Sequence, residues 1–297
     1  MIFKSLRPGS SIALVAPSSP FDPDLYEKGR RVLEDAGYTV VPGRSILRRE
    51  GYLAGADLER VRDLTDALLD PATDAVVCIR GGYGSGRLLT RLLFSTLSRR
   101  PKIFLGHSDV TFLHMAMICK MGWTTFHGPN LTGIAESAER AENVLRFLSG
   151  KAEFSWEFES GQVLKEGRVE GPVLGGNLTC LSHMIGTPFM PDLAGALLLI
   201  EDCGEALYRL DRMLNHLKLA GILPRLGGIL LGEFTNCAEN GDIYRMVMDH
   251  VRYFDYPVVY GLPFGHGDRN DVIPLASPFL LDTHERVLKA IEAPVRA

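Results

Sequence analysis

The sequence predicts an α/β protein with parallel sheets and two domains. Short, continuous apolar runs alternate with helical patterns, and such strands need helices on both faces of their sheet. The chain has 297 residues, of which 46% are hydrophobic, so it can form two cores. A polar stretch interrupts the alternation. We therefore expect an N-terminal domain over residues 1–150, a crossover linker over 151–170 and a C-terminal domain over 171–297.

The first half repeats the unit of a buried strand followed by a helix. The expected strands are IALVAP, YTVVPG, DAVVCIRGG and KIFLGH, and the expected helices cover about 24–36, 58–69, 87–93, 110–121 and 138–148. Order of this kind indicates a parallel sheet.

The second half has the same character. Its expected strands are GALLLIED, LGGILLGEF and PVVYGLPF, and its expected helices cover about 209–219 and 243–253. Ligand sites in such sheets lie beyond the carboxyl ends of the strands, so the residues that follow strands are the first candidates for function.

Composition excludes several classes of partner. The net charge is −4 without long runs of one sign, so no basic surface for nucleic acid or an anionic membrane is expected. The apolar stretch Ile12–Ala16 is too short for a signal-peptide core or a membrane span. The five cysteines are widely spaced, which predicts neither a disulfide framework nor a zinc site. We expect a reduced, cytoplasmic protein that acts on a small molecule.

Ser108 is the candidate nucleophile. It follows the strand KIFLG and precedes a helix that begins near Val110. A serine on such a turn is exposed at the carboxyl end of the strand, and the amides of the new helix face any negative charge that develops there. The alternative is that Ser108 or Asp109 only caps the helix, and the second glycine of the G-x-S-x-G pattern is missing.

Glu201 and His266 are the candidate partners of Ser108. Glu201 ends the buried run GALLLI, where a carboxylate can orient an imidazole, although Asp202 and Glu205 compete for this role. His266 lies between two glycines after the strand PVVYG, which leaves its imidazole uncrowded.

Several other strand-end residues are candidates for contacts with a ligand. The loop Arg80–Arg87 contains Gly81, Gly82 and Tyr83, and it suits an anion, an oxyanion hole or a plain tight turn; its spacing is neither that of a P-loop nor that of G-x-G-x-x-G. Asn177, after two glycines, and Trp156, in the polar stretch, are possible substrate contacts, and His127 is a second strand-end histidine.

Eight segments of the chain together resemble the LD-carboxypeptidase family of serine peptidases, which includes the microcin C immunity peptidases. The resemblance covers nearly the whole chain, in the expected order. The segments are IALVAPSSP, GYLAGAD, VCIRGGYGSGRLL, KIFLGHSDVTFLH, TFHGPN, GGNLTCLSHMIGTP, LLLIEDCGEALYRLDRMLNHL and PFGHGDRN.

The resemblance implies a Ser-Glu-His triad at Ser108, Glu201 and His266, in a cleft between two domains. It implies a flavodoxin-like or amidotransferase-like N-terminal domain and a C-terminal α/β domain of the swivelling type. It also implies a homodimer and no metal or organic cofactor. His107 departs from the family, whose members often carry an aromatic residue before the serine.

The function implied by the resemblance is release of terminal D-alanine from cytoplasmic murein tetrapeptides during cell-wall recycling. Amides of Asp109 and Gly82 would form the oxyanion hole, and Gly81, Tyr83, Asn177 and Trp156 would contact substrate. One alternative is an immunity-type peptidase that cleaves a peptidyl nucleotide, with Trp156 stacked on the base. A second is a nucleotide-binding module without catalysis.

Overall fold

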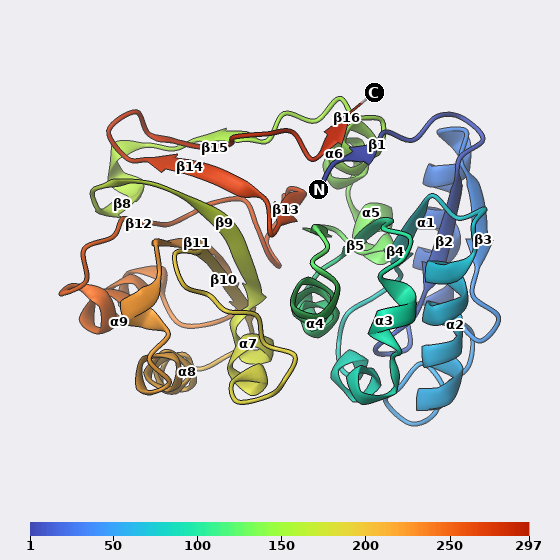
Figure 1. The fold of residues 1–297 in the computed structure, drawn as a ribbon, viewed down its shortest axis with the longest axis horizontal. Coiled ribbons are helices and arrows are strands. Elements are labelled where there is room, and N and C mark those ends of the chain that lie inside the picture. The colour runs from blue at the N-terminus through green and yellow to red at the C-terminus, as the bar shows by residue number, and fades with distance from the viewer. Residues whose placement is uncertain (297) are drawn as a thin grey trace.

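The computed structural model describes residues 1–296 and has two α/β halves that lie side by side (Figure 1). The N-terminal half is built on a six-stranded sheet in the order β13-β6-β5-β4-β2-β3, in which only β13 runs antiparallel to its neighbour. Its strands are β2 (Ser11–Val15), β3 (Thr39–Pro42), β4 (Ala75–Cys78), β5 (Ile103–Gly106), β6 (Thr125–His127) and β13 (Ile273–Leu275).

The strands β4 and β5 are buried along their whole length, as their unbroken apolar sequences predict. Local signals also set the ends of the helices: Asp22 accepts a hydrogen bond from the amide of Asp24 and so caps the first helix. The helices of this half are α1 (Pro23–Asp35), α2 (Asp57–Leu69), α3 (Phe94–Leu97), α4 (Thr111–Met121), α5 (Leu131–Glu136) and α6 (Ala138–Leu148).

The helix expected over residues 87–93 is replaced by a 3-10 segment, Ser85–Arg91, followed by the short α3. The cause lies at Ser85, whose amide and hydroxyl both donate to Asp109. The contact of Ser85 with Asp109, which is distant in the sequence, therefore fixes the first turn of this segment. The helical pattern of the segment itself does not decide its conformation.

The C-terminal half is built on an eight-stranded sheet in the order β7-β15-β14-β9-β10-β11-β12-β8. The strands β9 to β12 are parallel and carry the helices α7 (Leu178–Met184), α8 (Leu207–Leu219) and α9 (Asn240–Val251). The strands are β7 (Ser155–Glu157), β8 (Val163–Lys165), β9 (Arg168–Asn177), β10 (Leu197–Cys203), β11 (Gly228–Thr235), β12 (Val258–Val259), β14 (Pro278–Asp282) and β15 (Val287–Ala290).

The prediction of a linker over residues 151–170 is corrected by this sheet. The strands β7 and β8 and the start of β9 lie within the segment and pair with β15, β12 and β14. Polar residues alternate with apolar ones there because one face of these strands is more exposed than the other, a pattern typical of antiparallel edges.

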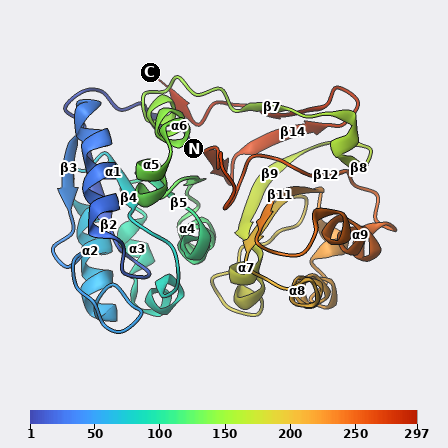
Figure 2. The same ribbon diagram turned by 180° about the vertical axis from the view of Figure 1, so that it is seen from behind.

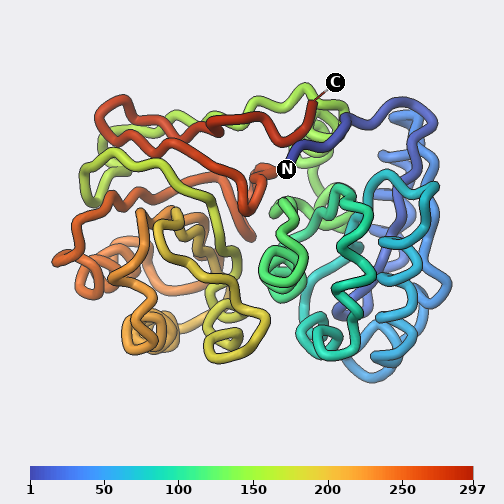
Figure 3. The backbone as a smooth tube through the Cα atoms, in the orientation of Figure 1, coloured from blue at the N-terminus to red at the C-terminus, as the bar shows by residue number. Residues whose placement is uncertain are grey.

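The chain also returns to the sheet and the first strand of the N-terminal half near its end. β13 pairs with β6, and β16 (Val295–Arg296) pairs with β1 (Phe3–Lys4), as the red segments beside the blue and green ones show (Figures 2 and 3). The segment that connects His266 to β13 is therefore held against the sheet that carries Ser108. Among residues 1–296, no helix is both long enough and apolar enough to cross a bilayer.

Candidate active site

Ser108 lies on a strained turn directly after β5. Its φ is +65°, a left-handed value that costs a residue with a side chain about 1–3 kcal/mol. A 3-10 turn (Ser108–Val110) follows and leads into α4. Gly81 lies so close that a Cβ there would be 2.8 Å from Cβ of Ser108. Strain and close approach together give Ser108 the geometry of the strand-to-helix turn that exposes a nucleophile.

The side chain of Asp109 holds this turn in place. Its Oδ2 accepts hydrogen bonds from the hydroxyl of Ser18 at 2.6 Å and from the amide of Ser85 at 2.7 Å, and it is almost fully buried. The hydroxyl of Ser85 also donates to the carbonyl of Asp109 at 2.5 Å. Asp109 therefore joins the loops that follow β2, β4 and β5, and neither it nor Ser108 caps α4 with its side chain.

Glu201 and His266 are in direct contact. Nδ1 of His266 lies 2.6 Å from Oε2 of Glu201, which is fully buried in β10. Gly265, with a φ of +117°, makes the approach possible, because a Cβ there would lie 2.7 Å from the same carboxylate oxygen.

The charges of this pair stabilise one another. Burial alone raises the pKa of Glu201, but the charge and hydrogen bond of His266, with His127 nearby, outweigh it and hold that pKa well below its usual range. Burial likewise lowers the pKa of His266, and the Glu201 carboxylate outweighs it, so the net pKa is raised. Since Glu201 is ionised, Nδ1 of His266 is the donor and Nε2 is left as the basic nitrogen.

The two competing carboxylates have other partners. Asp202 accepts from the side-chain amide of Asn177 at 2.9 Å and from the amide and hydroxyl of Thr179 at 2.9 and 2.8 Å. Glu205 pairs with Arg209 at 3.4 Å. Of the three acidic residues, Glu201 is the one that the structure brings to His266.

Ser108 and His266 line one cavity of about 330 Å³, to which both halves of the molecule contribute. It opens between three segments: the loop Arg80–Arg87 after β4, called here the glycine loop, the turn after β5 and the loop that carries His266. The lining residues are Arg80, Gly81, Gly82, His107, Ser108, Pro129, Asn130, Thr132, Gly133, Glu136, Arg140, Gly265, His266 and Asn270.

His107 is also part of the cavity wall. Its ring lies 5.0 Å from that of His266 and 6.0 Å from that of His127, measured between centroids. Burial, helped by these two neighbours, holds the pKa of His107 well below its usual value. The residue before Ser108 is therefore a neutral imidazole at neutral pH.

The residues expected to contact substrate divide into two groups. Gly81 and Gly82 line the cavity, whereas Tyr83 is exposed and contacts Tyr52 with 5.6 Å between ring centroids. Asn177 is buried and caps α7 by accepting from the amide of Cys180 at 3.1 Å. Within residues 1–296, the cavity wall includes neither Tyr83 nor Asn177.

Trp156 is likewise not among the residues that line this cavity within residues 1–296. Its indole N–H donates to Asp271 at 2.9 Å, and its ring packs against Phe264 and Phe279. The physical reason is that β7 is a strand of the C-terminal sheet, so this side chain packs on its neighbours within that half.

Sequence reasoning missed Arg140 and Asn270. Arg140, on α6, donates from Nη2 to the carbonyl of Gly267 at 2.6 Å and from Nε to that of Asp268 at 2.9 Å. Asn270 accepts from the amide of Gly265 at 3.1 Å. Both support the loop of His266. The motif PFGHGDRN contains Asn270, but an arginine on an amphipathic helix gives no such signal.

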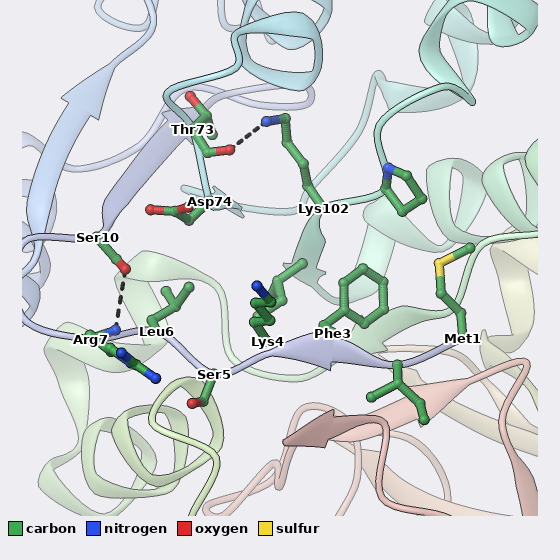
Figure 4. Close-up of a pocket in the computed structure, with 13 residues that line it drawn as sticks. Met1, Phe3, Lys4, Ser5, Leu6, Arg7, Ser10, Thr73, Asp74 and Lys102 are labelled. Carbon is green, nitrogen blue, oxygen red and sulfur yellow. Dashed lines mark hydrogen bonds between the residues drawn. The ribbon is translucent and has the colours of Figure 1, made fainter. Parts of the chain in front are cut away.

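A larger cavity, of about 670 Å³, lies near the amino ends of β2 and β5 (Figure 4). Met1, Phe3, Lys4 and Lys102 are among its lining residues, and the ammonium of Lys102 is bound to the carbonyls of Asp70 and Thr73. None of Ser108, Glu201 and His266 lines it. Among residues 1–296, no group of three His, Cys, Asp or Glu side chains is placed to hold a metal ion.

Models of one protein family match both halves of the chain. Residues 12–128 match the LD-carboxypeptidase N-terminal domain and residues 170–281 the LD-carboxypeptidase C-terminal domain. The chain is 36% identical to a probable murein peptide carboxypeptidase of Bacillus subtilis, over 98% of this chain and 94% of that one.

Two solved structures show the same fold. The muramoyltetrapeptide carboxypeptidase from Oxalobacter formigenes has a TM-score of 0.85 and 32% identity, covering 96% of this chain and 99% of its own. The microcin C7 self-immunity protein MccF, in complex with aspartyl sulfamoyl adenosine, has a TM-score of 0.90 at 22% identity, covering 100% of both chains. The chain therefore belongs to the LD-carboxypeptidase family and is a serine-type carboxypeptidase.

Proposed function

We propose that this enzyme releases the terminal D-alanine of murein tetrapeptides, with Ser108 as nucleophile, His266 as general base and Glu201 as the carboxylate that orients it. The observation that carries the proposal is the 2.6 Å contact between His266 and Glu201 in a loop that lines the same cavity as the strained Ser108. A buried acid, an imidazole and an accessible serine are the parts that acyl transfer requires.

The reaction proceeds in two steps. Nε2 of His266 takes the hydroxyl proton of Ser108 while Oγ attacks the carbonyl carbon of the last peptide bond. The tetrahedral intermediate collapses, and His266 returns the proton to the departing amine of D-alanine. Water, deprotonated by His266, then cleaves the acyl-serine ester and releases the shortened peptide. Glu201 stays ionised throughout and stabilises the imidazolium.

Backbone amides of Asp109 and Gly82 are the proposed oxyanion donors. The first follows the nucleophile, and the second belongs to the glycine loop that lines the cavity. The side chain of Asp109 supports this role by fixing its own backbone through Ser18 and Ser85.

Arg80 suits the free carboxylate that a carboxypeptidase must bind. Arg80 and Arg140 are the lysine or arginine residues that line the cavity within residues 1–296. Arg80 is exposed and is bound through Nη1 to the carbonyl of Pro20, which leaves other N–H groups of its guanidinium for a carboxylate.

The proposed substrate class follows the relatives that share about a third of the sequence and are named murein peptide or muramoyltetrapeptide carboxypeptidases. We also propose that the enzyme acts in the cytoplasm, where free murein peptides are recycled, and that it forms a homodimer. Size-exclusion chromatography with light scattering tests the dimer, and cell fractionation tests the location.

Cleavage of a peptidyl nucleotide is a second candidate. The exposed Tyr83 of the glycine loop and its neighbour Tyr52 offer an aromatic surface on which a base can stack. A nucleotide-binding module without catalysis is a third candidate, but it gives no reason for the buried pair of Glu201 and His266.

One experiment separates these candidates. The purified enzyme is incubated with murein tetrapeptide, with the same peptide ending in L-alanine, and with aspartyl sulfamoyl adenosine, and products are followed by mass spectrometry beside Ser108→Ala. We expect release of D-alanine that is lost in the variant and is absent from the L-alanine peptide. Cleavage of the nucleotide alone would favour the second candidate, and nucleotide binding without turnover, unchanged in Ser108→Ala, the third.

A further inference from the structure

The imidazole of His127 is buried between the two halves of the molecule with no assigned role. It ends β6, where it pairs with Gly106 of β5, two residues before Ser108. On its other side lies Gly176 of β9, at which a Cβ would be 3.5 Å from Cδ2 of the imidazole. Neither ring nitrogen of His127 has a hydrogen-bond partner.

Another buried atom without a partner lies opposite this ring. Oε1 of Glu201 accepts no hydrogen bond, and it is 3.9 Å from Nε2 of His127. The other oxygen, Oε2, is bound to His266. Leaving a buried donor and a buried acceptor unpaired costs about 1–3 kcal/mol each, and 3.9 Å exceeds hydrogen-bond length by about 1 Å.

We propose that His127 is a positioning residue whose Nε2–H donates to Oε1 of Glu201 in the reacting enzyme. The carboxylate is then held by one imidazole from each half, His266 on Oε2 and His127 on Oε1. The inference rests on the proposed role of Glu201 in the triad and extends it to a residue outside the triad.

The arrangement links Ser108 to His266 through the pairing of β5 with β6 and through Glu201. Ser108 follows β5 and His127 ends the neighbouring strand β6, so their separation is fixed by the register of these two strands. Glu201 and His266 belong to the other half. A bond from His127 to Glu201 therefore sets the position of the acid and base relative to the serine, which is the requirement for proton transfer within about 3 Å.

Three substitutions test where the donor must be. In His127→Gln the side-chain N–H lies near the place of Nε2, in His127→Asn it lies near the place of Nδ1, and His127→Phe has none. The rate measured is covalent labelling of Ser108 by a fluorophosphonate, in which Oγ bonds to phosphorus and fluoride leaves. This rate needs an activated serine but no peptide, so it stays informative if the murein substrate is wrong.

We expect the labelling rate to fall about 10- to 100-fold in the Phe and Asn variants and to stay within about threefold in the Gln variant. The expected loss is that seen when a group that orients a metal-binding side chain is removed. With murein tetrapeptide the loss should be in kcat and leave KM nearly unchanged. A Phe variant as fast as the wild type, or a folded Gln variant as slow as the Phe variant, would overturn the proposal.

A measurement on the wild-type enzyme needs no variant to fold. Nitrogen-15 NMR of the histidines, after labelling of Ser108, reports which ring nitrogen of His127 carries its proton. The proposal requires the proton on Nε2. A proton on Nδ1 of the neutral ring would leave no donor toward Glu201 and would refute it.

Discussion

Arg140 donates from Nη2 to the carbonyl of Gly267 at 2.6 Å, although 127 residues separate the two in the sequence. A second bond, from Nε to the carbonyl of Asp268, is 2.9 Å long. Helix α6 of the N-terminal half thus holds the backbone that follows His266. The position of the proposed base relative to Ser108 depends on this contact between the two halves.

Replacing Arg140 should impair catalysis through the loop of His266. Each charge-assisted bond contributes about 1.5–3 kcal/mol, so we expect Arg140→Ala to lower kcat/KM at least about tenfold. Arg140→Lys should recover part of this loss, because an ammonium can reach one carbonyl but lacks the planar fork. Steady-state kinetics on murein tetrapeptide is the measurement.

Arg146→Ala is the matched control for this prediction. Arg146 lies on the same helix, and its one side-chain hydrogen bond in the described structure goes to the carbonyl of Lys151 at 3.5 Å. Its removal should leave kcat/KM within about twofold. Equal losses in the Arg146 and Arg140 variants would mean that α6 as a whole, and not the contact with Gly267, is responsible.

Strain at Ser108 predicts a gain in stability when the nucleophile is replaced by glycine. The φ of +65° costs alanine as much as serine but costs glycine little. We expect the free energy of unfolding of Ser108→Gly, measured in urea, to exceed that of Ser108→Ala by about 1 kcal/mol. Both variants should be inactive. Ala276, with a φ of +60°, offers a control: Ala276→Gly should gain similar stability and keep activity. A Ser108→Gly variant no more stable than Ser108→Ala would show that the turn relaxes without the hydroxyl.

Most of the fold could be predicted from the sequence because its signals are local. The helix expected over 138–148 is α6, Ala138–Leu148, and the strand KIFLGH contains β5. The strands β7, β8 and β13 were missed because they are short and their pairing partners are distant in the sequence. Pairing of this kind depends on tertiary contacts that no sequence window contains.

The site could be predicted only where its residues follow strands. Ser108, Glu201 and His266 each come directly after or within an apolar run near a glycine, which is visible in the sequence. Arg140 is not, since its partners are backbone carbonyls of another segment. The sequence also gives no sign that the N–H of Trp156 is bound to Asp271, because the two residues are far apart in the chain.

Gly81 should tolerate no side chain without loss of activity. A Cβ there would lie 2.8 Å from Cβ and 3.0 Å from Oγ of Ser108. Because contacts this short force one side to move, we expect Gly81→Ala to lower kcat by about tenfold or more and fluorophosphonate labelling of Ser108 with it. Gly161→Ala, whose new methyl group would meet no atom within 4 Å, should leave both rates unchanged. Unaltered labelling in Gly81→Ala would contradict the close packing of the glycine loop on the serine.

The pair of Glu201 and His266 predicts opposite effects of pH on activity and stability. Glu201 raises the pKa of His266 above 6.5, and only the neutral imidazole accepts the proton of Ser108, so kcat/KM should fall as pH drops through that raised value. The stabilisation from protonated His266 is fully present below 6.5, its unfolded value, and is lost as pH rises through the folded pKa. The stabilisation from Glu201, whose pKa is lowered in the folded state, is present above pH 4.5, its unfolded value. It is lost as the pH falls through the folded pKa of Glu201.

The variant Glu201→Gln tests both effects. Without the Glu201 carboxylate, burial is the largest influence on the pKa of His266 and lowers it, so the acid limb of kcat/KM should move to lower pH while the maximum falls about 10²- to 10⁴-fold. In urea unfolding of the wild type, the contribution of the pair to the free energy of unfolding should be largest between pH 4.5 and pH 6.5, which is below the pH range of full activity. This maximum should vanish in the variant. Glu201→Gln removes the charge with little change in shape, so a shift of the acid limb would report the lost charge. An acid limb that stays in place would mean that a group other than His266 sets it.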